Sequence, residues 1–218
     1  ERERMRGLFR EAAERHALPV IEEDDAPIEA AGTRTTLSWR EARGRQADLL
    51  GTHGRLADLI AVPRPDRAAN LGFNTLYAAL MSSGRPVLMC PAQAPTALPG
   101  RIALAWNGSM EASRAVAVGL ALLRASAGVH ILTVGETPEG TTPEALARYL
   151  AGHGVVSEIE VLAGSGDIGA RLLARAKAAQ ADLLMMGAYS HSRGRESLFG
   201  GASQYVVDHA DLPVFLVH

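Results

Sequence analysis

The sequence predicts an α/β protein made of two tandem copies of one unit, each an open, mostly parallel five-stranded sheet flanked by helices, with an incomplete first copy. Three observations predict this. Apolar, strand-like runs alternate with helical patterns. Short motifs of the first half recur in the second half. A loop punctuated by glycines follows the apolar run from Leu183 to Met186. Strands that alternate with helices imply a parallel sheet with right-handed crossovers.

The second copy contains every element of such a unit. The expected order is strand 101–107, helix 109–126, strand 129–134, helix 143–152, strand 157–162, helix 167–180, strand 182–186, helix 201–209 and strand 212–217. Ser109 and Asp167 stand before two of these helices as N-caps, because their side chains can accept hydrogen bonds from the first turn. The first strand is expected to be central, in the order 2-1-3-4-5 or 3-2-1-4-5.

The first half repeats motifs of the second half in the same order. Residues 57–60 match 181–184 at an offset of 124, and residues 86–88 match 213–215 at an offset of 127. Residues 49–50, which follow the run 37–42, match 172–173, which follow the run 159–163. We therefore assign residues 1–92 to a degenerate first domain, 93–100 to a linker and 101–218 to a complete second domain.

The first copy begins with a helix, at about residues 3–16, and has no counterpart of the first strand, first helix and second strand of the second copy. Without a central strand, its sheet would have unpaired edges. We expect either that the polypeptide extends beyond Glu1 or that another chain supplies these strands.

The composition of the chain limits which kinds of partner and of binding site it can have. The 22 basic and 24 acidic residues give a net charge of −2, which provides no electrostatic argument for a nucleic-acid or membrane surface. A single cysteine, Cys90, excludes a disulfide framework within one chain. No apolar stretch reaches the roughly 18 residues that span a bilayer. These features favour a cytoplasmic protein, and the seven scattered histidines indicate no metal site.

The glycine loop carries a spaced motif. Gly187 is followed by Ser190, by nine residues from His191 to Phe199, and then by Gly200 and Gly201. This pattern resembles the universal stress protein family, whose ATP-binding members have Gly-x-x-Gly, nine residues, then Gly-Ser or Gly-Thr. Ser190 and Gly201 depart from that pattern.

Two further segments carry the resemblance. The end of the first strand of the second copy, Trp106-Asn107-Gly108-Ser109, is similar to the family's Val-Asp-Gly-Ser, with Asn107 in place of the aspartate, and Leu212-Pro213-Val214 resembles its last strand. The resemblance implies a fold like that of the adenine-nucleotide alpha-hydrolases, dimer-like packing through the last strand, a cytoplasmic location and a role in stress resistance. Tandem copies can satisfy that packing within one chain, and a homodimer stays open.

The motif indicates where a nucleotide would bind. Backbone N–H groups at a glycine-rich helix start can hold phosphates, because the helix N-terminus carries partial positive charge. The candidate nucleotide-binding residues are Asn107, Val134, Gly187, Ser190, Gly200, Gly201 and Ser203, with His191 and Arg193 as basic residues of the phosphate loop. The resemblance implies ATP or another adenine nucleotide, and Mg²⁺ would arrive with it.

Each of these residues also has a structural interpretation. The glycines can simply form a turn and a helix start, Asn107 can be a turn residue, and the loop charges can be solvated. The first copy gives an internal comparison, because Pro63 and Asp66 stand opposite Gly187 and Ser190. Pro63 has no N–H and Asp66 would repel phosphate, so we expect no nucleotide to bind there in this manner.

Three hypotheses for function follow. The first is a nucleotide-binding stress or regulatory protein with at most weak ATPase activity, since the loop offers no general base with an orienting partner and no Walker sequence occurs. The alternative is a module that binds no nucleotide and works by dimerising or docking. The third is an enzyme, either an adenylating ATP pyrophosphatase or an ATPase. The pyrophosphatase would need a Ser-Gly-Gly-x-Asp-Ser-like loop after its first strand, and Trp106-Asn107-Gly108-Ser109 is not such a loop.

Overall fold

The computed structural model describes residues 2–21, 35–66, 69, 72–93, 100–163, 166–189 and 201–218. The chain divides into two compact units, Glu1–Gly44 and Arg45–His218. The predicted linker, 93–100, falls within the span of the second unit, and its residues 94–99 lie outside the described part of the chain.

The first unit contains the helix expected at its start, α1 (Arg2–Arg15). The ring of Phe9 on α1 lies 5.4 Å from that of Trp39, centroid to centroid. Glu41 forms ion pairs with Arg2 and, at 3.4 Å, with Arg6. We expected the run 37–42 to correspond to a strand of the second sheet, and this is wrong. Its described pairing is a single bridge between Leu37 and Val20, because its side chains pack on α1 instead.

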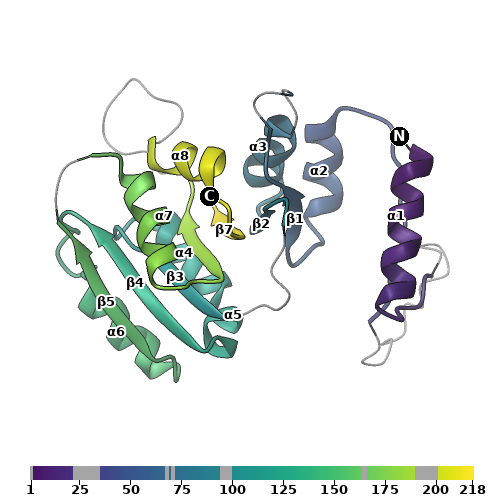
Figure 1. The fold of residues 1–218 in the computed structure, drawn as a ribbon. Helices are drawn as coiled ribbons and strands as arrows, with labels where there is room; N and C mark the ends of the chain where they lie inside the picture. The colour runs from purple at the N-terminus through teal and green to yellow at the C-terminus, as the bar shows by residue number, and fades with distance from the viewer. Residues whose placement is uncertain are drawn as a thin grey trace. The chain divides into compact units, whose positions relative to one another are not determined.

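The second unit is built on one mostly parallel sheet of seven strands, which confirms the α/β class (Figure 1). Its strands are β1 (Ile60–Pro63), β2 (Val87–Cys90), β3 (Arg101–Ala105), β4 (Gly128–Val134), β5 (Ser157–Leu162), β6 (Leu183–Gly187) and β7 (Val214–Val217), in the order β1-β2-β7-β6-β3-β4-β5. The two separate sheets predicted from the sequence are joined into one. Antiparallel pairing of β2 with β7, in which Leu88 faces Phe215, makes the connection.

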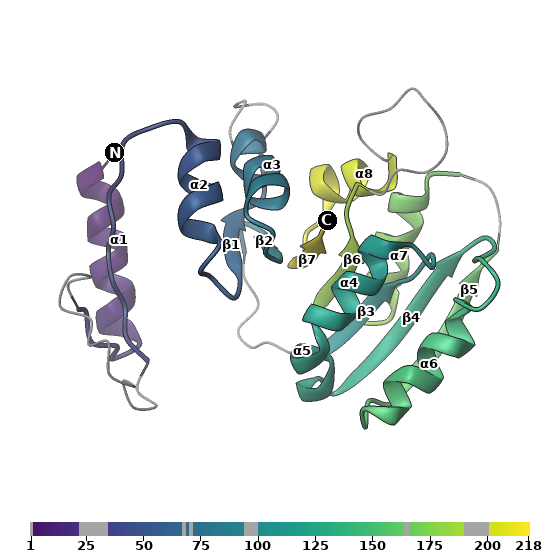
Figure 2. The same ribbon diagram turned by 180° about the vertical axis from the view of Figure 1, so that it is seen from behind.

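Helices cover both faces of this sheet. They are α2 (Gln46–Gly54), α3 (Phe73–Ser82), α4 (Met110–Val118), α5 (Leu120–Ala125), α6 (Pro143–Gly152), α7 (Ile168–Ala178) and α8 (Gly201–His209). Figures 1 and 2, which view the sheet from opposite sides, show α7 on one face and α4 and α6 on the other. Two buried clusters fill the two sides, one packed under α3, α7 and α8 and the other under α4, α5 and α6.

The second copy follows the order 3-2-1-4-5, one of the two that the sequence predicted, with β3 as its first and central strand. Its caps are also as expected. The Ser109 hydroxyl accepts from the Ala112 N–H at 3.2 Å, and the Asp167 carboxylate accepts from the Ala170 N–H at 3.0 Å. The single helix expected at 109–126 is divided into α4 and α5 at Gly119. There the backbone passes so close to Met185 that a Cβ would lie 2.5 Å from its Cε.

The elements α2, β1, α3 and β2 follow one another as α7, β6, α8 and β7 do. Subtracting the sequence offset of 127 from the residue numbers of β7, 214–217, gives 87–90, which are the bounds of β2. β1 lies at one end of the strand order. These elements belong to the segment that the sequence assigns to the first copy.

Candidate functional site

The candidate site lies where the direction of the strand order reverses. From β3 the chain continues through β4 to β5 on one side, and then crosses back to β6 and β7 on the other. β3 and β6 are parallel neighbours, with Ile102 beside Leu183, so their carboxyl ends adjoin. Such a switch point is where open α/β sheets bind ligands. A cavity of about 230 Å³ opens at this point.

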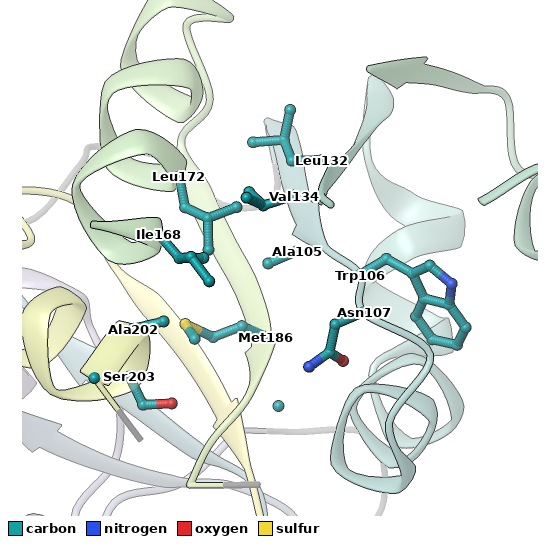
Figure 3. Close-up of a pocket in the computed structure, with 12 residues that line it drawn as sticks. Ala105, Trp106, Asn107, Leu132, Val134, Ile168, Leu172, Met186, Ala202 and Ser203 are labelled. Atoms are coloured by element: carbon teal, nitrogen blue, oxygen red, sulfur yellow. The ribbon is translucent and has the colours of Figure 1, made fainter. Parts of the chain in front are cut away.

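Three sets of elements form the cavity (Figure 3). The ends of β3, β4 and β6 provide one wall, the first turns of α7 provide Ile168 and Leu172, and the start of α8 provides the third part. The residues that line it are Ala105, Trp106, Asn107, Leu132, Val134, Ile168, Leu172, Met186, Gly187, Gly201, Ala202 and Ser203. None of these lining residues has an ionisable side chain. Most of these side chains are apolar, and Asn107 and Ser203 add polar groups.

Gly187 lines the cavity as expected, and packing also requires a glycine there. A Cβ at this position would lie 2.5 Å from the backbone nitrogen of Ala112 and 2.6 Å from the carbonyl carbon of Glu111. The end of β6 thus touches the first turn of α4, where no side chain fits. The structural interpretation of this glycine is sufficient by itself.

Gly201 differs in this respect. It begins α8 and lines the cavity, but a Cβ built on it meets no heavy atom of the described residues within 4 Å. Among the described residues, no packing contact demands glycine here. Its N–H belongs to the first turn of α8, where backbone donors have no partner within the helix. Gly201 is thus the lining glycine whose substitution would test the ligand rather than the fold.

Ser203 is the third residue of α8, and its hydroxyl oxygen has a partner in the protein. It accepts a hydrogen bond of 3.1 Å from the N–H of Tyr189, and Ser203 itself is buried. Tyr189 has a φ of 55°, a left-handed conformation that is unusual for a bulky residue. The Ser203 hydroxyl therefore stabilises the backbone after β6, in addition to facing the cavity.

Asn107 follows β3 at the rim of the cavity. Its Oδ1 accepts a hydrogen bond of 3.1 Å from the N–H of Ser109, which is the turn interaction that the sequence offered as an alternative. The residue nevertheless lines the cavity, and Figure 3 shows its amide nitrogen on the side facing Met186. The turn and the ligand-facing interpretations are thus compatible. Neighbouring Trp106 directs its indole away from the cavity and donates to the Thr141 carbonyl at 2.8 Å.

The structure brings together five of the predicted site residues, namely Asn107, Val134, Gly187, Gly201 and Ser203. Ser190, His191, Arg193 and Gly200 lie outside the described residues. Sequence reasoning missed the apolar walls, above all Met186, Ile168 and Leu172. Their positions, at the end of a strand or in the first turns of a helix, could have indicated that they line a site. Apolar residues at such positions, however, look the same in sequence as ordinary core residues.

The first copy has a different cavity at the corresponding strand ends. It measures about 530 Å³ and lies between Pro63 on β1, Cys90 on β2 and the end of α8. The Arg64 guanidinium donates to the Asp208 carbonyl at 2.7 Å, and the Asp66 carboxylate accepts from the Ala69 N–H at 3.1 Å. Burial raises the pKa of the Cys90 thiol. A carboxylate and a proline thus occupy the places that glycine and serine have in the second copy.

Two further properties bear on the kind of site. Within the described residues, no three His, Cys, Asp or Glu side chains gather in a group that could hold a metal ion. No helix in the described part of the chain is long and apolar enough to cross a membrane.

Comparison with known proteins gives consistent results. Residues 139–218 match the model of the universal stress protein family. A universal stress protein from Synechocystis sp. is 31% identical over 144 residues, which cover 62% of this chain and 47% of that protein. The chain thus spans about half the length of the curated relative that it matches.

A solved structure shares the fold. A universal stress protein from Archaeoglobus fulgidus superimposes with a TM-score of 0.69 at 19% identity, covering 99% of this chain and 76% of that one. Another universal stress protein, solved in complex with cAMP, is 25% identical with a TM-score of 0.42, covering 55% of this chain and 96% of that one. Residues 139–218 therefore carry a universal stress protein domain, and the chain shares the fold of a solved universal stress protein.

Proposed function

We propose that this chain is a tandem universal stress protein whose second copy binds ATP or a related adenine nucleotide, in a regulatory or stress-resistance role and with little or no catalysis. The observation that most supports this is the cavity at the switch point, beside the start of α8. A cytoplasmic location is part of the proposal. The matching order of α2-β1-α3-β2 and α7-β6-α8-β7 supports the tandem arrangement.

The chemistry of the cavity suits the two ends of a nucleotide. Its volume, about 230 Å³, is below the roughly 300 Å³ at which pockets for drug-sized ligands begin. It would therefore hold the base, against Leu132, Val134 and Leu172, and leave the phosphates outside. The α8 N-terminus is the nearby positive end of a helix dipole, and its free N–H groups suit phosphate oxygens. No described lining residue is a carboxylate, so Mg²⁺ would be held by the phosphates.

The same lining argues against efficient hydrolysis. A general base must be within hydrogen-bond reach of the attacking water, and the described residues that line the cavity include no histidine, carboxylate, lysine or cysteine. A nucleotide held there would serve as a signal or as a structural ligand. The first copy, with Pro63 and Asp66 at its strand ends, would serve as the packing partner of the second.

The test uses Gly201, because a side chain fits there without a steric clash. Gly201→Glu places a carboxylate in the first turn of α8, where it favours the helix but repels phosphate. Gly201→Gln is the neutral control of the same shape. We expect isothermal titration with Mg-ATP to show binding by the wild type and the Gln variant, and binding at least about tenfold weaker by the Glu variant, a difference of about 1.4 kcal/mol.

Two results would contradict the proposal. One is a wild-type protein that takes up no ATP, neither on purification, as seen by native mass spectrometry, nor on addition. The other is ATP binding of equal strength by both variants, which would place the phosphates away from α8.

The alternative function, an interaction module that binds no nucleotide, has one observation in its favour. Gly187 and Ser203 both have roles in packing and in backbone hydrogen bonding that would preserve them without a ligand. Dimerisation through the last strand would not be that module's mode of action, since β7 already pairs with β2 on one side and β6 on the other. An absence of ATP binding by the wild type would favour this alternative.

A further inference from the structure

α8 lines two cavities, one at each of its ends. Its first three residues, from Gly201 to Ser203, line the cavity at the switch point, and Asp208 and His209 line the cavity of about 530 Å³ beside the ends of β1 and β2. The nine residues of α8 make a rigid element about 13 Å long. A group that holds the C-terminal end of this helix therefore also sets the position of its first turn.

The first copy holds that C-terminal end through Arg64, the residue directly after β1. The Arg64 guanidinium donates to the Asp208 carbonyl at 2.7 Å. Carbonyls in the last turn of a helix have no partner within the helix, and the helix dipole favours a cation beside them. The bond thus joins the segment assigned to the first copy to the last helix of the second copy.

The backbone that carries Arg64 is itself fixed. The Arg64 N–H donates to the Cys90 carbonyl at 2.8 Å, which extends the pairing of β1 with β2 by one residue. Pro63 and Pro65 stand on either side of Arg64. Proline fixes its own φ and biases the residue before it toward an extended backbone. Pro63, which has no N–H to donate to a phosphate, therefore helps to stiffen the segment from which the guanidinium reaches α8.

We propose that Arg64 is a positioning residue for the nucleotide site, which holds α8 from the first copy so that its first turn, with Gly201, meets the phosphates of the ligand. This inference rests on the proposed function, and it gives the first copy a part in nucleotide binding beyond packing. The walls proposed for the base, Leu132, Val134 and Leu172, belong to β4 and α7. The effect of Arg64 therefore falls on the phosphates and not on the base.

Arg64→Gln removes the cation, whereas Arg64→Lys keeps a cation that can donate to a single carbonyl. The matched control is Arg85→Gln. Arg85, also in the first copy, donates through Nε to the Arg55 carbonyl at 2.9 Å, and neither residue lines either cavity. Isothermal titration measures the affinities for Mg-ATP and for adenosine, which has no phosphate. Hydrogen exchange of the α8 amides, followed by mass spectrometry without nucleotide, gives a readout that does not depend on binding.

We expect Arg64→Gln to bind Mg-ATP about three- to tenfold more weakly than the wild type, which corresponds to the loss of one hydrogen bond, and to bind adenosine equally well. Arg64→Lys should bind Mg-ATP more tightly than Arg64→Gln, and Arg85→Gln should match the wild type with both probes. Without nucleotide, the last turn of α8 should exchange faster in Arg64→Gln than in the wild type or in Arg85→Gln.

Unchanged Mg-ATP affinity in Arg64→Gln would overturn the inference, as would unchanged exchange in α8. An equal loss of adenosine affinity, or an equal loss of Mg-ATP affinity in Arg85→Gln, would also overturn it, because a general loss of stability would then explain the result. A wild type that binds neither probe would overturn the proposed function and this inference with it. Failure of the inference alone is distinct, since the wild type then still binds Mg-ATP.

Discussion

At the scale of single residues, two glycines of one motif are glycine for different reasons. A Cβ at Gly187 would lie 2.5 Å from the Ala112 nitrogen, whereas a Cβ at Gly201 would meet no heavy atom of the described residues within 4 Å. We expect Gly187→Ala to lower the free energy of unfolding by about 1–3 kcal/mol, the usual cost of overpacking a fixed backbone contact. Gly201→Ala should lie within about 1 kcal/mol of the wild type, or raise its stability, because alanine favours a helix.

Urea denaturation followed by circular dichroism would measure both changes. Equal losses of stability in the two variants would show that α4 moves to admit the new methyl group, or that Gly201 has a structural role. The sequence predicted both glycines as site residues, and both line the cavity. It could not separate their roles, because the contact of Gly187 is with α4, about 75 residues earlier in the chain.

Ser203 and Asn107 show the same limit of sequence reasoning. The sequence placed both near the ligand, and the structure adds a partner for each, Tyr189 for Ser203 and Ser109 for Asn107. The Ser109 interaction is local and was predictable from the Asn-Gly turn. The Tyr189 interaction was not predictable, because it depends on the left-handed backbone conformation at Tyr189 and on where α8 begins.

At the scale of elements, the helix starts were well predicted because capping is local. Ser109 and Asp167 were identified as N-caps and each accepts from the third residue after it. The break between α4 and α5 was missed, since the apolar stripe of that helix runs on through Gly119. At this break, Gly119 packs against Met185 on β6, a residue far away in the chain.

The packing of α1 on the following segment gives a pH prediction. Hydrogen bonds from the Trp39 indole and from Arg2 lower the pKa of Glu41 below its ordinary value. A carboxyl group whose pKa is lower in the folded state than in the unfolded state stabilises the fold when the pH is above the unfolded-state pKa, which is about 4.3 for glutamate. This stabilisation is lost as the pH falls through the folded-state pKa. We therefore expect the contact between α1 and Trp39 to weaken on acidification below about pH 4.

An NMR titration of the Glu41 side chain would give its pKa directly, and Trp39 fluorescence would report the contact. Glu41→Gln is the control, because its amide does not titrate and the acid-dependent change in Trp39 fluorescence should disappear. A Glu41 pKa at or above the ordinary glutamate value would contradict the prediction.

At the scale of the whole second unit, antiparallel pairing of β2 with β7 makes one sheet from the strands of both copies. The core beneath it is shared as well, since Leu76 and Met89 of the first copy belong to one buried cluster with Val206 and Leu216 of the second. We therefore expect Arg45–His218 to unfold as one cooperative unit. Leu88→Pro, which removes a backbone N–H from an interior strand, should lower the unfolding midpoint of the second copy too.

Trp106, buried in the second copy, provides the readout once Trp39 is replaced by phenylalanine. In that background, Leu88→Pro should shift the thermal transition seen by Trp106 fluorescence to a lower temperature, whereas Leu88→Val should shift it little. A Trp106 transition that is unaffected by Leu88→Pro would mean that the two copies unfold independently.

The sequence alone determined what depends on local patterns: the α/β class, the strands and helices of the second copy, their caps, the repeat offsets and the glycine motif at the end of β6. Periodicity, turn residues and motif spacing all depend on residues that are close together in the sequence. Only the tertiary structure decided that the copies share one sheet, that Gly187 faces α4, that Met186 and Leu172 enclose a cavity, and which end of the Asn107 amide faces it. Each of these depends on contacts between residues far apart in the chain, or on the exact course of a backbone, and no local pattern specifies either.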